Sequence, residues 1–192
     1  MAAGALAAGG MVVSSAPALA ATTVLTCTSG SGTAHLAPGI GATPTQQTIS
    51  DPANVSGCSG SEAGTITHGT NTFSNLKTQP TGSPPAQPQC STLGNVVPAG
   101  TIVATGGVIS TKWFNSANAQ VATSAGSLKL KGTGVALQVK AIIKITSGKF
   151  FVSGHTTKAK VNVNFSLHPG QTCPTLQIVD TTDAGNLNVT RV

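Results

Sequence analysis

The chain has 192 residues, of which only 7% are charged, with ten Lys and Arg against four Asp and Glu. A typical soluble domain carries about 25% charged residues. Thr, Ser, Gly and Val are abundant, Tyr is absent, and few stretches favour helix. This composition argues against a helix-rich cytosolic enzyme and is typical of an extracellular β-protein.

The N-terminal stretch MAAGALAAGGMVVSSAPALA is apolar and ends on Ala18-Leu19-Ala20. That ending fits a secretory cleavage site, so we predict a signal peptide over 1–20 and a secreted or cell-wall-associated single domain over 21–192. No Lys or Arg precedes the apolar part, which we interpret as a start placed too far downstream. The segment is too short and Gly-rich for a transmembrane helix, so we expect no membrane span.

The mature chain contains an even number of cysteines, Cys27, Cys58, Cys90 and Cys173. In an exported chain this predicts two disulfides, for which the sequence alone leaves three connectivities. We favour Cys27–Cys58 with Cys90–Cys173, because each bridge then staples its own half of the chain. A zinc site is disfavoured, since no Cys-x-x-Cys pair exists and no histidine lies at ligand spacing from a cysteine. We therefore expect no metal and no cofactor.

The first half of the mature chain alternates short strand patterns with turns. We predict a strand over 22–28, followed by turns at Pro38-Gly39 and Pro44 that interrupt regular structure. The run GTITHGT at 64–70 is another short strand pattern. The stretch 78–89 contains four prolines, and Cys90 directly after it favours a long solvated loop over a linker between domains.

The second half contains the clearer strand signals. Residues 100–110 have strand character interrupted by Gly106-Gly107. Trp113, the single tryptophan, is interpreted as a core anchor in preference to an exposed ring that stacks on a ligand. The alternating run at 127–131 predicts a strand that leads into a long hairpin.

That hairpin, over 134–167, has the longest period-two alternation in the chain. We predict central strands at Val135–Ile145 and Thr157–Leu167, each with one apolar face toward the core. Two closing strands are expected at 176–179 and 187–190. With turn signals recurring about every ten residues, the pattern predicts an all-β fold, an antiparallel β-sandwich of immunoglobulin-like or jelly-roll-like type with two disulfides.

A set of short motifs occurs in a particular order along the mature chain: Cys27, Pro38-Gly39-Ile40, Cys58-Ser-Gly, Gly64-Thr-Ile-Thr, Cys90, Trp113-Phe114-Asn115, Thr146-Ser-Gly-Lys-Phe, Cys173 and a C-terminal Gly-x-Leu-x-Val. In order and spacing it resembles a group of small secreted proteins from high-GC actinobacteria, mostly described as hypothetical. The resemblance implies export, four paired cysteines and a β-sandwich, and carries over no catalytic residue. The Pro-rich insertion at 78–89 and the lysine content depart from the group, so no ligand is carried over.

The sequence offers little catalytic chemistry. It has no His-x-His, no His-Glu-x-x-His and no Gly-x-Ser-x-Gly. Asp180 and Asp183 are most simply turn residues. We therefore favour a non-catalytic module that binds or coats, and retain as the alternative a secreted hydrolase using a histidine with Asp180 or Asp183.

One charge pattern is not random. Six lysines occupy the polar phase of strands whose other phase is apolar: Lys129, Lys131, Lys140, Lys144, Lys158 and Lys160. If the strands share a sheet, these lysines form one basic face, which would attract an anionic envelope polysaccharide or teichoic acid. Strand lysines also commonly protect sheet edges against aggregation, and we keep that interpretation open. Nucleic acid is not an expected partner, because arginine is limited to Arg191 and no aromatic residues interleave the lysines.

Overall fold

The computed structural model describes residues 20–79, 88–173 and 175–192. The predicted signal peptide lies almost wholly outside the described residues, as do residues 80–87 of the predicted Pro-rich loop. The described chain is all-β and antiparallel, as predicted, with one short 3₁₀ turn, η1, at Cys90–Thr92. No helix in these ranges has the length and apolar character needed to cross a membrane.

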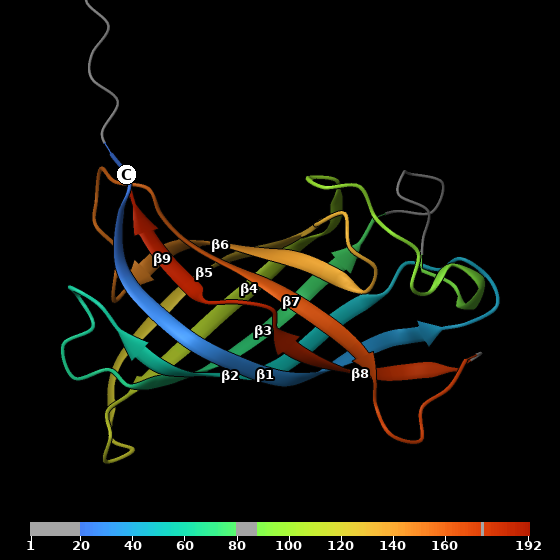
Figure 1. Ribbon diagram of the computed structural model, residues 1–192, viewed down its shortest axis with the longest axis horizontal. Helices are drawn as coiled ribbons and strands as arrows, with labels where there is room; N and C mark the ends of the chain where they lie inside the picture. Colours follow the sequence, from blue (N-terminus) through green and yellow to red (C-terminus); the bar gives the residue numbers. More distant parts are fainter. Residues whose placement is uncertain (1–19, 80–87, 174) are drawn as a thin grey trace, which may run out of the picture.

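The strands are long, and nine of them are described (Figure 1). Their bounds are β1 Thr22–Ile40, β2 Thr48–Ser59, β3 His68–Thr78, β4 Ile102–Phe114, β5 Gln120–Gly132, β6 Gln138–Gly148, β7 Thr157–Leu167, β8 Leu176–Asp183 and β9 Leu187–Arg191.

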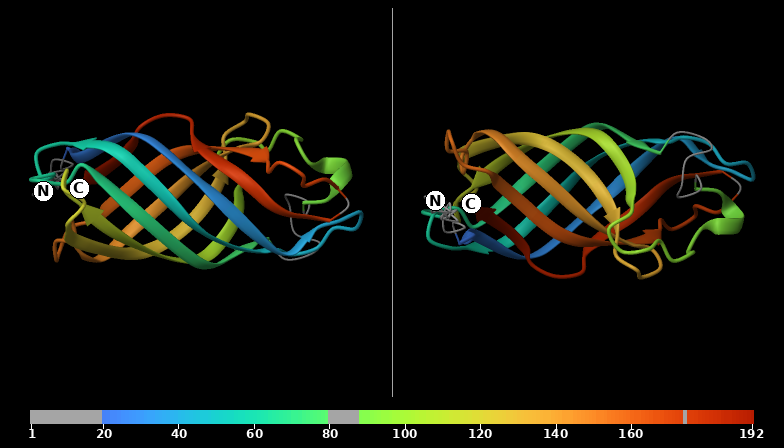
Figure 2. Two further views of the ribbon diagram at one scale, coloured as in Figure 1. Left: turned by 90° about the horizontal axis from the view of Figure 1, so that it is seen from below. Right: turned by 90° about the horizontal axis from the view of Figure 1, so that it is seen from above.

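All nine strands belong to one continuous sheet. Strands β2 to β8 pair in sequence order, and β1 pairs with β2 on one side and with β8 and β9 on the other. Figure 2 shows the strands running obliquely around a common interior. The predicted sandwich of two packed sheets is therefore not confirmed. Its sequence signature, alternation with regular turns, is equally compatible with one sheet that curves around its own apolar face.

The apolar phase of the strands fills this interior, where Leu25, Leu76 and Leu176 are fully buried. The predicted strand over 157–167 coincides with β7, and the apolar phases of β6 and β7 face inward as expected. The predicted start of the preceding strand is wrong, because β6 begins at Gln138. Val135 and Leu137 are 52% and 41% exposed, and Leu137 has a positive φ that ends the alternation.

Two predicted interruptions are also wrong. Strand β1 continues through Pro38-Gly39 to Ile40, where its pairing with β8 is irregular, and a proline is tolerated where ladder hydrogen bonds are interrupted. Strand β4 likewise continues through Gly106-Gly107, with a register shift at that point. The GTITHGT pattern is only partly strand, because β3 begins at His68.

Trp113 is a core anchor, as predicted. It is 3% exposed, its indole Nε1–H donates to Ser124 Oγ at 2.9 Å, and the Phe150 ring meets it edge-on. The hydrogen bond satisfies the one polar group of a buried indole.

Both favoured disulfides are confirmed, Cys27–Cys58 and Cys90–Cys173. The first joins directly opposed residues of β1 and β2. The second ties the segment over 88–98 to the connection between β7 and β8. That segment lies at the end of the sheet away from the C-terminus (Figure 1).

Candidate functional site

The six predicted lysines are brought together on the outer surface of β5, β6 and β7, here called the lysine face. Lys131 pairs directly with Lys140, and Lys144 with Lys158. The remaining two, Lys129 and Lys160, flank Ile142 in one row across the three strands. Five of the six are exposed and Lys131 is half-buried, while the alternate residues of these strands face the core.

No carboxylate balances this face from within its own strands, because the sequence contains no Asp or Glu between Glu62 and Asp180. The ion pairs found in the described part of the chain join Arg191 to Glu62 and His168 to Asp180, and neither involves a lysine. Among the described residues, the lysine face therefore carries positive charge that no ion pair compensates.

The pairing of β5, β6 and β7 tests whether their lysines protect a sheet edge against aggregation. Each of β5, β6 and β7 is hydrogen-bonded to a neighbour on both sides. Lysines that prevent aggregation act on strands with an unpaired edge. Since none of the three strands is an edge, edge protection does not account for their lysines.

The structure places only one of the two candidate aspartates beside a histidine. His168 Nδ1 lies 2.9 Å from Asp180 Oδ1, and Thr33 Oγ1 also donates to this carboxylate at 3.3 Å. Both members of the pair are partly exposed. Within the described ranges, no hydroxyl or thiol is hydrogen-bonded to His168, so the pair has no adjacent nucleophile to activate.

Asp183 instead faces the interior, where it lines a cavity of about 80 Å³ together with residues such as Phe73 and Val163. Its Oδ2 atom is buried and has no hydrogen-bond partner among the described residues. Burial raises the pKa of this carboxyl to about 6, because the apolar surroundings disfavour the charged form. The described lining of the cavity includes no histidine.

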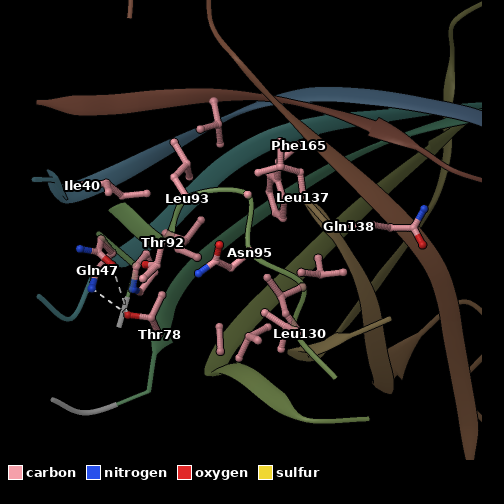
Figure 3. Close-up of a pocket in the computed structure, with 18 of the residues that line it drawn as sticks. Ile40, Gln47, Thr78, Thr92, Leu93, Asn95, Leu130, Leu137, Gln138 and Phe165 are labelled. Atoms are coloured by element: carbon pink, nitrogen blue, oxygen red, sulfur yellow. Dashed lines mark hydrogen bonds between the residues drawn. The ribbon is translucent and has the colours of Figure 1, made fainter. Parts of the chain in front are cut away.

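Sequence reasoning missed a larger feature, an apolar chamber of about 370 Å³ at the end of the sheet where β1 ends and β6 begins. Its walls are inward-facing residues of the strands, including Ile49, Leu130 and Phe165, and its roof is the segment over 88–98. Figure 3 shows Leu93 of the roof and Leu130 and Phe165 of the walls around this chamber. No Asp, Glu, Lys, Arg or His is present in the described lining.

One polar group in the chamber wall is unusual. Gln47 is 1% exposed, and its side-chain Nε2 has no hydrogen-bond partner in the described chain. The residue is held in place by its backbone N–H, which donates to Thr78 Oγ1 at 2.9 Å. A buried amide donor without an acceptor costs about 1–3 kcal/mol.

No family model, no curated protein and no solved structure matches this chain. Membership of the actinobacterial secreted group therefore stays a prediction.

Proposed function

We propose that the protein is a secreted, non-catalytic module whose lysine face binds an anionic cell-envelope polymer, such as a teichoic acid or an acidic polysaccharide. The observation that carries the proposal is the direct opposition of Lys131 with Lys140 and of Lys144 with Lys158, on strands that contain no acidic residue.

Like charges directly opposite each other in a sheet destabilise the pairing of the two strands. The lysine face therefore carries a stability cost that no edge-protection role offsets. A repeating anionic chain would relieve this repulsion, because lysines on one face lie about 7 Å apart along a strand and about 5 Å apart across strands.

Each exposed lysine contact is worth about 1 kcal/mol or less, so useful affinity depends on several contacts acting together. Such binding weakens steeply as salt is added, since exposed charges are screened. Secretion is part of the proposal, and the two disulfides support it because they persist in oxidising compartments.

The chain offers a matched control for testing the lysine face. The Lys129/Lys140/Lys158→Gln and Lys77/Lys112/Lys149→Gln variants lose the same net charge, the second from outside the face. Binding to poly(glycerol phosphate) and to polygalacturonate is measured across a salt gradient. We expect the first variant to lose most of its affinity and salt dependence for at least one polymer and the second to lose little. Equal losses would show that net charge alone matters and would refute the proposal.

The alternative, a secreted hydrolase, is supported by the His168–Asp180 contact alone. Neither residue lines the apolar chamber or the cavity around Asp183. A partly exposed pair outside these two cavities favours the binding module, because a hydrolase must hold its substrate against the nucleophile. Hydrolysis of an ester or glycoside panel by the wild type, lost in His168→Ala, would reverse this preference.

A further inference from the structure

We infer that the apolar chamber is a binding site for a neutral, largely apolar small molecule that carries a hydrogen-bond acceptor, with Gln47 Nε2 as the donor that recognises it. This site is separate from the lysine face, and the inference does not depend on the proposed function.

The size of the chamber requires an explanation. Protein interiors are close-packed, with few voids larger than a water molecule. A chamber of about 370 Å³ falls within the roughly 300–1,000 Å³ typical of ligand sites. An apolar cavity of about 150 Å³ holds one benzene, so this chamber has room for roughly 15 non-hydrogen atoms.

The lining defines the chemistry of the occupant. It is largely apolar, which offers few partners to water, and its described part has no charged side chain. A carboxylate or an ammonium group would therefore be desolvated without a counter-charge, which is costly. A neutral ligand avoids this cost. Its acceptor would satisfy Gln47 Nε2, the buried donor left without a partner among the described residues.

The entrance suits the same ligand class. Four residues that line the chamber are also exposed: Val96, Val135, Leu137 and Leu167, at 59%, 52%, 41% and 49%. Exposed apolar groups gathered in one place mark interaction sites more often than scattered ones. The roof above them is fixed at both ends, because Cys90 N–H donates to the Gly41 carbonyl and Gly134 N–H donates to the Val97 carbonyl. The chamber is thus a preformed site with an apolar entrance.

The probe for the test is prodan, a neutral naphthalene with one ketone, whose emission shifts to the blue in apolar surroundings. We expect saturable, blue-shifted binding of one prodan per protein. Ala104→Phe, which enlarges a buried side chain in the chamber wall, should abolish it. Val108→Phe, on the same strand but 56% exposed, should bind as the wild type does. Absence of saturable binding, or equal binding by the two variants, would overturn the inference.

The role of Gln47 is tested with Gln47→Leu and with the prodan analogue in which a methylene replaces the ketone. Loss of one hydrogen bond should weaken prodan binding roughly three- to tenfold and leave the analogue unaffected. Equal weakening of both probes would remove Gln47 from the recognition.

A second measurement does not depend on any variant folding. In the wild-type complex, nuclear Overhauser effects should connect prodan to the methyl groups of Leu93 and Leu130, which line the chamber. No such effect should reach Leu25, which is buried near the other end of β1. The reverse pattern would place the probe elsewhere and overturn the inference.

Discussion

The Asp183 carboxylate of β8 occupies the space that a side chain at Gly30 of β1 would fill. A Cβ built at position 30 overlaps Asp183 Oδ2, and the two residues follow the opposed pair Ser31 and Thr182 in the ladder. The carboxylate has room in the interior because the neighbouring strand has no side chain at that point. The described lining of its cavity contains no Lys or Arg.

We predict that Asp183 makes stability fall as pH rises from about 4 to 6. The folded pKa is about 6 against an ordinary value of 3.8, so the folded state keeps its proton where the unfolded state has lost it. The free energy of unfolding of the Asp183→Asn protein should exceed that of the wild type by about 1–2 kcal/mol at pH 7 and should equal it near pH 4. The figure for pH 7 is reduced because the carboxyl is partly exposed. Urea unfolding across this range measures the difference, and a gain independent of pH would contradict the burial argument.

The Glu62–Arg191 pair is predicted to act with the opposite sign. The Arg191 guanidinium, which bonds both Glu62 oxygens, lowers the pKa of that carboxyl. Its stabilisation is then present above the unfolded pKa and is lost as pH falls through the folded pKa. Glu62→Gln should cost about 1 kcal/mol at pH 7 and progressively less in acid. The same urea series serves as the measurement, and a constant cost would indicate packing in place of charge.

Gly30→Ala is expected to destabilise the protein by about 1–3 kcal/mol, because the new methyl group overlaps the Asp183 carboxylate. The loss should be largely recovered in the double variant Gly30→Ala/Asp183→Ala, which removes the overlapping group. A double-mutant cycle from urea midpoints measures the coupling. Additive losses would mean that other contacts made by Gly30, such as the Asn54 carbonyl, set the cost.

Removing the Cys90–Cys173 bridge should lower the local stability of the chamber roof more than that of the sheet. On the chain-entropy model a loop closed over 83 residues contributes about 4.5 kcal/mol. We expect Cys90→Ser/Cys173→Ser to lose less than this, because the roof can detach while the strands stay paired. Amide exchange should therefore accelerate in 88–98 and not in β6. Uniform acceleration would show that the roof and the sheet unfold together.

The positions of individual strands could largely be predicted from the sequence, but the way distant strands pair could not. Alternation located β7 at both ends, and charge phase identified the lysine face, because both depend on neighbours two residues apart. The predictions were wrong at Pro38, where β1 continues to Ile40, and at Leu137, which precedes the first residue of β6. At both positions, pairing with a distant strand determines where the strand ends. The contacts of β1 with β2, β8 and β9 have no local signal. The chamber also has no local signal, because its walls come from many strands. Gln47 has none either, because it lies in an ordinary polar stretch.

The position of β1 between β2 and the last two strands has a consequence for the order of assembly. One edge of β1, the first strand of the described chain, pairs only with β8 and β9, the last two strands. The sheet therefore cannot form completely until these C-terminal residues are available. Pairings so distant in sequence make folding slow. Until then β1 presents unpaired backbone along its 19 residues, an edge that could pair with another chain. Amino-acid changes that speed aggregation without altering the native stability are therefore expected to cluster on the side of β1 that receives β8 and β9.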